Sequence, residues 1–165
     1  MKPSVHYELA FEAFLRACRW PYVAVNEQRR AISRDGKLKS FDFVIHANNC
    51  QPWLVDIKGR KLPYLCAGGA HYWENWVTEA DLSDMRHWQE VFGEAHLAVF
   101  VFAYWLIVPD LVDDLAIFRF RRRDYLFTAI SVHAYERHAR RRSRRWGTWY
   151  LSRRDFRRLA WPLRP

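Results

Sequence analysis

The sequence predicts an α/β fold in which one central, mixed sheet lies between two layers of helices, a three-layer α/β/α sandwich. Segments 4–19 and 81–92 place apolar residues at helical spacing. Segment 97–108 is apolar throughout, which is typical of a strand covered on both faces. Helices on both sides of a sheet provide that cover, so these observations predict the same architecture.

The size and composition of the chain predict one domain with its own core. The 165 residues are too few for two domains of ordinary size. Half of the residues are hydrophobic and 17% are aromatic, which argues against a disordered chain. We expect a single domain over residues 1–165, with a core at about 4–108 and an arginine-rich C-terminal extension at about 116–165.

In the first third of the chain, the elements follow the order helix, strand, hairpin. The helix begins at the cap residue Ser4 and runs to about Arg19, where Trp20-Pro21 ends it. The predicted strands are 22–25, 41–47 and 53–59, with a polar loop at 34–40 and a hairpin turn at 48–52.

The remaining elements begin with a helix over 81–92 that starts at Thr78 or Asp81 and ends at Gly93. A strand at 97–108 follows this helix, and Pro109 ends that strand. The other predictions are no regular structure over 62–77, strands at 117–120 and 125–132, a short helix at 133–142, and a strand followed by a helical end within 146–159.

The N-terminus has no signal-peptide pattern, because Glu8 and Glu12 interrupt its apolar residues. The longest apolar run, 97–108, is shorter than the roughly 20 residues of a spanning helix. The three cysteines are an odd number without C-x-x-C spacing, which argues against a disulfide framework and a zinc ribbon. We therefore expect a cytoplasmic protein that uses neither a membrane nor an organic cofactor.

Positive charge is concentrated in the last third of the chain. The net charge is +9, but residues 1–115 carry 12 basic and 15 acidic side chains. The remainder carries 15 arginines against three acidic residues. Arginine is favoured for binding phosphate, so this distribution indicates a polyanionic partner, nucleic acid before membrane. A solvated charged face or a basic tail would give the same composition.

Two aspartates and a lysine interrupt otherwise apolar strands. They are Asp42 in "SFDFVI" and Asp56 and Lys58 in "WLVDIKGR". If the hairpin turn is centred near Asn49, residues whose numbers sum to 98 lie opposite each other, which pairs Asp42 with Asp56. Lys58 then shares the face of Asp56, because side chains alternate with period two. The opposite face, toward the core, takes Phe41, Phe43, Val55 and Ile57.

Two carboxylates facing each other about 5 Å apart repel, so this face of the hairpin needs a cation. Mg²⁺ or Mn²⁺ fits, because Mg²⁺ is usually held by one or two carboxylates together with water and substrate phosphate. Lys58 could orient or deprotonate the attacking water, or stabilise charge on the phosphorane. A D-x-K tripeptide alone is commonly a structural Asp–Lys pair, so this interpretation depends on the whole combination.

The order of a helix with Glu8, then "FDFVI", then "VDIKG" resembles the PD-(D/E)XK nuclease superfamily. Many restriction endonucleases and archaeal Holliday-junction resolvases share its fold. The resemblance covers about residues 6–107 and implies a restriction-endonuclease-like fold and Mg²⁺-dependent hydrolysis of DNA. Resolvase-like members act as homodimers, which implies a homodimer here.

The resemblance also assigns roles to individual residues. Asp42 and Asp56 match the acidic motif residues and Lys58 the catalytic lysine, while Phe41 replaces the motif proline. In resolvase-like members a glutamate on the first helix joins the metal site, and Glu8 has the matching spacing. From the residues alone, Glu8 could equally be a surface residue near a helix N-terminus.

Other side chains are weaker candidates, each with an ordinary structural alternative. Glu12 and Gln89 are possible additional site residues, or ordinary helix-face residues. Possible phosphate contacts are Arg29, Arg30, Lys37, Lys39 and Arg60 in loops that flank the site, and Arg121, Arg122, Arg141, Arg144 and Arg145 in the basic third. Trp73, Trp76, Trp146 and Trp149 could stack on bases or pack in the protein.

The sequence therefore predicts a Mg²⁺-dependent deoxyribonuclease, of endonuclease type, that uses metal-activated water. Two alternatives remain open at this point: a nucleic-acid-binding module of the same fold without the chemistry, and an RNA-directed nuclease.

Overall fold

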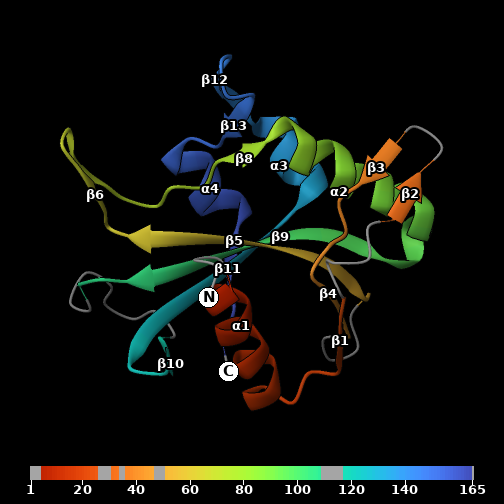
Figure 1. Ribbon diagram of the computed structural model, residues 1–165, viewed down its shortest axis with the longest axis horizontal. Helices are drawn as coiled ribbons and strands as arrows, with labels where there is room; N and C mark the ends of the chain where they lie inside the picture. Colours follow the sequence, from red (N-terminus) through yellow and green to blue (C-terminus); the bar gives the residue numbers. More distant parts are fainter. Residues whose placement is uncertain (1–4, 26–30, 34–35, 47–50, 109–116, 165) are drawn as a thin grey trace.

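A central sheet separates helix α1 from helices α2, α3 and α4 (Figure 1). The structure is a computed structural model that describes residues 5–25, 31–33, 36–46, 51–108 and 117–164. The predicted hairpin turn at 48–52 lies mostly outside the described residues.

The described residues in the first part of the chain form one helix and seven strands. They are α1 (Val5–Ala17), β1 (Tyr22–Ala24), β2 (Ala31–Ser33), β3 (Gly36–Leu38), β4 (Phe43–Ile45), β5 (Trp53–Leu62), β6 (Tyr64–Cys66) and β7 (Gly69–His71).

The second part contains the remaining helices. They and the strands between them are β8 (Val77–Thr78), α2 (Glu79–Phe92), a 3₁₀ turn (Gly93–Ala95), β9 (Leu97–Leu106), β10 (Phe118–Phe120), β11 (Arg123–Ser131), α3 (Val132–His138), β12 (Arg140–Ser143), β13 (Thr148–Tyr150), α4 (Arg153–Leu159) and β14 (Trp161–Pro162).

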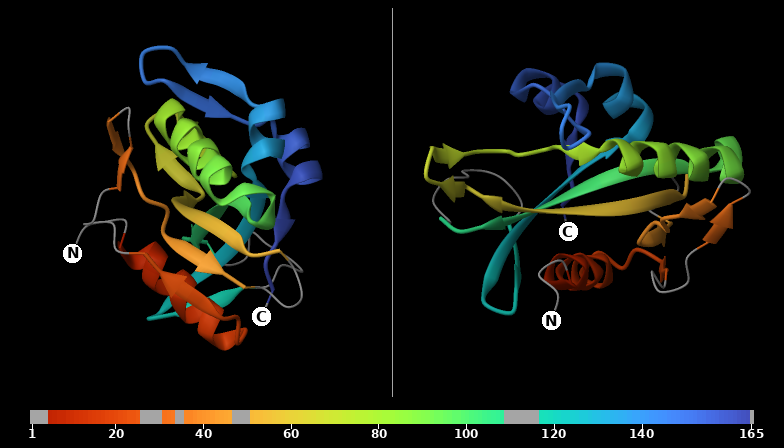
Figure 2. Two further views of the ribbon diagram at one scale, coloured as in Figure 1. Left: turned by 90° about the vertical axis from the view of Figure 1, so that its right-hand side faces the viewer. Right: turned by 45° about the horizontal axis from the view of Figure 1, so that its top comes forward.

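The main sheet has the order β1-β4-β5-β9-β11-β10, and β14 also pairs with β11. Strands β5 and β9 are parallel, whereas the other neighbours are antiparallel, so the sheet is mixed. Strand β9 lies between β5 and β11 and is buried along most of its length, as its continuous apolar sequence predicts. Figure 2 shows α1 on one face of the sheet and α2, α3 and α4 on the other. The predicted three-layer sandwich is confirmed.

Each face of the sheet has its own hydrophobic core. One core joins α1 to the sheet through residues such as Phe11, Phe43 and Val55. The other lies under α2, α3 and α4 and includes Leu54 and Phe100. The core predicted to end near residue 108 continues into β11, because both faces of that strand are buried.

Several of the secondary-structure predictions were wrong. Segment 62–77 contains the exposed hairpin β6–β7 and the start of β8, where exposure removes the apolar alternation that marks a strand. The predicted loop at 34–40 contains β3. The predicted helix at 133–142 ends at His138, and Arg140–Ser143 instead pairs with β13 as a strand.

Phe41 lies on the opposite face from the predicted one. It packs against Trp88 and Phe92 beneath α2, whereas Phe43 packs against Phe11 beneath α1. The backbone bends at Asp42, so β4 begins only at Phe43 and the period-two alternation does not extend to Phe41.

No helix in the described part of the chain combines the length and apolar character needed to cross a membrane. Two of the cysteines, Cys18 and Cys66, are described, and both are free thiols.

A close contact at Gly59 sets the distance between α1 and β5. A Cβ atom at position 59 would lie 2.2 Å from Cδ2 of Tyr7, far inside van der Waals contact. The ring of Tyr7 is buried and sits directly over the strand backbone. Only glycine permits this approach, which brings the helix of Glu8 against the strand of Lys58.

Replacing Gly59 with alanine should therefore destabilise the fold. We expect the Gly59→Ala variant to lose about 1–3 kcal/mol of unfolding free energy through overpacking against the Tyr7 ring. Urea denaturation followed by circular dichroism measures this loss.

Gly68→Ala is the matched control, because its Cβ would meet only the Cys66 sulfur, at 3.9 Å. We expect that variant to stay within about 0.5 kcal/mol of the wild type. If both variants are equally stable, the Tyr7 contact does not set the position of the helix.

Candidate active site

The β4–β5 hairpin has the predicted register. Its three ladder pairs, Phe43 with Val55, Val44 with Leu54 and Ile45 with Trp53, all sum to 98. Beyond the last pair, Asp42 bonds to both neighbours of Asp56. Its backbone N–H donates to the Val55 carbonyl at 2.8 Å, and its carboxylate Oδ2 accepts from the Ile57 N–H at 2.6 Å. Asp42 is thus fixed beside Asp56, although the two residues are not a ladder pair.

Asp56 and Lys58 form a buried ion pair on one face of β5. Lys58 Nζ lies 2.5 Å from Asp56 Oδ2 and 2.7 Å from Asp81 Oδ1. Asp56 is 2% exposed and Lys58 7% exposed, so water screens these charges poorly. The shared face of Asp56 and Lys58 agrees with the prediction. The second carboxylate, Asp81, was not predicted to join them.

A second lysine reaches the same carboxylates from the segment before the hairpin. Lys39 Nζ lies 3.3 Å from Asp56 Oδ1 and 3.6 Å from Asp81 Oδ1. The Trp88 indole N–H donates to the Lys39 carbonyl at 2.9 Å, which holds this segment against α2. Lys39, predicted as a phosphate contact in a loop, therefore also belongs to the charge cluster.

Helix α2 brings Asp81 to the site because its N-terminus is capped in a defined way. The Thr78 side chain accepts from the Asp81 N–H, and the Asp81 carboxylate accepts from the Thr78 N–H at 2.9 Å. This capping box fixes Asp81 in the first turn of the helix, above Lys58. The T-x-x-D spacing is visible in the sequence, but the packing of α2 on β5 is not.

The local charges shift the pKa of both Asp81 and Lys39. Burial raises the pKa of Asp81, but the Lys58 ammonium and the bonds with Thr78 outweigh it and lower that pKa to about 2. Burial lowers the pKa of Lys39, but the aspartates, Asp56 first, outweigh it and raise that pKa above its ordinary value. One turn beyond Asp81, burial raises the pKa of Asp84.

Glu8 and Asp42 border the same small cavity, of about 140 Å³, between α1 and the start of β4. Glu12 lines it as well, but its carboxylate is bound by Arg16 at 2.7 Å and by the Tyr22 hydroxyl at 2.8 Å. Of the two predicted glutamates, Glu12 thus has a structural role on the helix surface. Glu8 remains the candidate for the site.

Gln89 and Arg60 have structural roles that the sequence did not reveal. The Gln89 amide donates to the Gly93 and His96 carbonyls and accepts from the Ala98 N–H, joining the end of α2 to β9. Arg60 was predicted to lie in a loop, but it is inside β5. Its guanidinium donates to the Gly59 carbonyl at 2.8 Å and lies 4.0 Å from the centroid of the Trp76 ring.

The other predicted phosphate contacts lie in three places. Arg29 and Arg30 are outside the described residues, and of Lys37 only the backbone, in β3, is described. Arg121 and Arg122 are exposed at the β10–β11 turn. Arg141, Arg144 and Arg145 are exposed on the β12–β13 hairpin.

The described side chains of this site have the donor chemistry, but not the arrangement, of a site for a divalent metal ion of the Mg²⁺ class. Asp42, Asp56, Asp81 and Asp84 supply four carboxylates against the ammonium groups of Lys39 and Lys58. Among the side chains that the structure describes, this leaves an excess of negative charge, and carboxylate oxygen is the donor that Mg²⁺ prefers. The described residues contain no group of three or more His, Cys, Asp or Glu side chains arranged as metal ligands.

The low pKa of Asp81 makes a prediction about stability. Ionised Asp81 stabilises the fold fully above its ordinary pKa of about 4, and this contribution is lost as the pH falls through its folded value of about 2. We expect Asp81→Asn to cost about 2 kcal/mol at pH 6, and the cost to shrink as the pH approaches 2. Urea unfolding of both proteins across this range measures the difference.

Asp84→Asn is the control, because the pKa of Asp84 is raised and its ionised form is disfavoured in the fold. That variant should be no less stable than the wild type at pH 6. A cost of Asp81→Asn that does not change with pH would mean that the Lys58 pair does not stabilise the fold.

Comparison with known proteins identifies a similar fold but no family. No protein-family model and no curated protein sequence matches this chain. Among solved structures, it is similar to Hjc, a Holliday junction resolvase from the archaeal hyperthermophile Archaeoglobus fulgidus. The TM-score is 0.53 and the identity 12%, over 97% of this chain and 94% of that one. The chain therefore has a mixed α/β fold of the restriction-endonuclease-like type.

Proposed function

We propose that this protein is a divalent-metal-dependent deoxyribonuclease of the PD-(D/E)XK type. The observation that carries the proposal is the buried cluster in which Lys58 lies between Asp56 and Asp81 while Asp42 is bonded on either side of Asp56. Buried charges are costly unless they are well paired, and groups with a shifted pKa, such as Asp81 here, gather at functional sites. The Hjc-like fold supports a nuclease before other enzymes that use carboxylates.

Asp42 and Asp56 would hold Mg²⁺ or Mn²⁺, with Glu8 as a third contributor across the small cavity that it shares with Asp42. The bound metal would supply Lewis-acid polarisation of the phosphate and a lower pKa for attacking water. Asp56 is oriented for this role by the two ammonium groups next to it, and Asp42 by the Ile57 N–H.

Lys58 would act on the reacting phosphate. Its ammonium is fixed by Asp56 and Asp81, so it needs little reorganisation to stabilise negative charge that develops on the phosphorane oxygens. Asp81 is a positioning residue in this scheme, because it acts through Lys58. Its cap at the start of α2 keeps that ammonium in place.

The arginines supply the reason for a DNA substrate. Arg121 and Arg122 at one hairpin turn, and Arg144 and Arg145 at another, present exposed guanidinium groups for phosphates. Binding through phosphates should weaken steeply with salt, because it releases counterions from DNA. The homodimer that the family resemblance implies stays a prediction, which sedimentation velocity can test.

One observation favours a second candidate, a DNA-binding module without catalysis. Lys58 and Lys39 already pair with Asp56 and Asp81, so lysines supply part of the positive charge that these aspartates require. Such a module would bind DNA and cut none.

Cleavage assays separate the two candidates. We expect the wild type to nick plasmid, single-stranded or branched DNA with Mg²⁺ or Mn²⁺, and Asp56→Asn and Lys58→Gln to lower the rate by about 10²–10⁴-fold. Lys61→Gln is the matched control, because Lys61 is an exposed lysine on the same strand. Cleavage by none of the proteins, or equal cleavage by all, would overturn the catalytic assignment.

Metal binding gives a readout that does not depend on turnover. Isothermal titration with Mn²⁺ should show binding to the wild type and a loss of at least about tenfold in affinity for Asp42→Asn, which removes one charged ligand. Glu8→Gln should also weaken Mn²⁺ binding, whereas Glu12→Gln should not, because Arg16 and Tyr22 already bind its carboxylate. Unchanged affinity in Asp42→Asn would exclude Asp42 as a metal ligand.

A further inference from the structure

A groove rich in aromatic and arginine side chains lies between segment 72–78 and the β12–β13 hairpin. It consists of two neighbouring hollows, of about 490 and 530 Å³, that share Glu74, Trp76 and Arg142. Tyr72 and Arg153 line the first hollow, and Trp146 lines the second. We call the two hollows together the aromatic groove.

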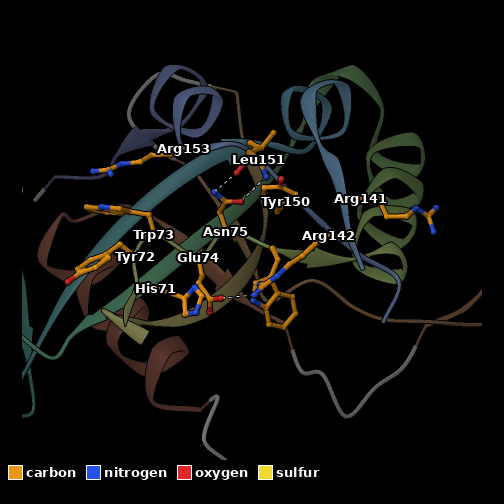
Figure 3. Close-up of a pocket in the computed structure, with 11 residues that line it drawn as sticks. His71, Tyr72, Trp73, Glu74, Asn75, Arg141, Arg142, Tyr150, Leu151 and Arg153 are labelled. Atoms are coloured by element: carbon orange, nitrogen blue, oxygen red, sulfur yellow. Dashed lines mark hydrogen bonds and ion pairs between the residues drawn. The ribbon is translucent and has the colours of Figure 1, made fainter. Parts of the chain in front are cut away.

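The floor of the aromatic groove is held rigidly. The buried Asn75 amide donates to the Leu151 carbonyl at 3.1 Å and accepts from the Leu151 N–H at 2.8 Å, as Figure 3 shows. The Tyr135 hydroxyl bonds to the carbonyls of Asn75 and Trp149. These contacts fix the backbone around Asn75 and Leu151, so a ligand would meet a preformed floor.

Several rings at the groove are more exposed than core packing requires. Trp146 is 70% exposed at the tip of the hairpin and Tyr72 is 50% exposed. Trp73 is held at a φ of 58°, a left-handed conformation that bulky residues rarely adopt and that is found at ligand-binding sites. Exposed aromatic rings on a rigid base are typical of a stacking surface.

The charge around these rings is mostly positive. Arg142 binds Glu74 at 2.9 Å, as Figure 3 shows, and its guanidinium lies 5.7 Å from the Trp76 ring centroid. Arg145 lies 5.2 Å from the Trp146 centroid, and the neighbouring Arg144 is exposed. In Figure 3, Arg141 points away from the labelled group. The remaining arginines place positive charge next to the rings, which complements a phosphate backbone.

Arg60 connects the candidate active site with the aromatic groove. Residues 56, 58 and 60 lie on the same face of β5, and two residues of a strand span about 7 Å. The Arg60 guanidinium lies 4.0 Å from the centroid of the Trp76 ring and donates to the Trp76 carbonyl. One strand step therefore separates Lys58 from the arginine that contacts the groove.

We propose that the aromatic groove binds an unpaired DNA strand next to the candidate active site. Bases would stack on Trp146 and Tyr72, and phosphates would pair with Arg142 and its neighbours. Bases inside a duplex are already stacked and cannot present their faces to these rings, so the groove selects single-stranded DNA. The consequence for cleavage rests on the proposed nuclease function: the preferred substrate is DNA in which an unpaired strand adjoins a duplex.

Binding without cleavage tests the groove by itself. Fluorescence anisotropy in EDTA measures affinity for a dye-labelled dT oligonucleotide and for a duplex of equal length, with wild type, Trp146→Ala, Tyr72→Ala and the double variant. Because stacking contributes about 1–3 kcal/mol per base, each alanine should weaken single-strand binding about tenfold and both together about 100-fold. Duplex affinity should stay within about twofold.

Trp146→Phe is the matched control, because it keeps an aromatic face at the same exposed position and should retain most of the affinity. Circular dichroism and thermal melting check that each variant is folded. Wild-type affinity in the alanine variants, an equal loss for duplex and single strand, or tighter binding of an RNA homopolymer than of DNA would each overturn the proposal.

These outcomes are distinguishable from failure of the nuclease assignment. If single-strand binding depends on Trp146 but the protein cuts no DNA, the groove proposal stands and the catalytic assignment is overturned. If cleavage depends on Lys58 but single-strand binding does not depend on Trp146 or Tyr72, the nuclease assignment stands and the groove proposal is overturned.

Discussion

The Lys58 ammonium held between Asp56 and Asp81 is the interaction on which the site depends. It connects β5 to α2 with 2.5 and 2.7 Å contacts in a poorly hydrated setting, where a charge without a partner is strongly destabilising. Other features of the fold serve this contact. The Thr78 cap fixes the position of Asp81, and the absence of a side chain at Gly59 lets α1 pack against the strand next to Lys58.

The part of the site that follows from local pattern was predictable from the sequence. Turn position and period-two alternation gave the β4–β5 register and the shared face of Asp56 and Lys58. The predicted alternation fails at Phe41, the residue before Asp42, because alternation assumes an unbroken strand. The bend at Asp42 is instead set by bonds to Val55 and Ile57, which the sequence pattern does not encode.

The part that depends on packing between distant elements was not predictable. A capping box indicates that Asp81 stands in the first turn of a helix, but not which strand lies beneath that turn. Arg60 was misplaced for a related reason. Its segment is charged and looks like a loop, yet β5 continues through it in pairing with β9, and the Arg60 guanidinium packs on Trp76. Burial of a charged side chain on an aromatic ring leaves little trace in hydrophobic periodicity.

One face of β5 carries the residues for both proposed tasks of the protein. Asp56 and Lys58 would serve the proposed chemistry, and Arg60 links them to the groove. The two tasks nevertheless depend on different partners: α2 holds Lys58, while segment 72–78 and the β12–β13 hairpin form the groove. Under the proposed function, changes at the hairpin would alter which DNA is bound without moving the Lys58 ammonium. This separation would let the proposed reaction site keep one geometry for different DNA structures, because the hairpin is exposed and far less constrained by packing than β5.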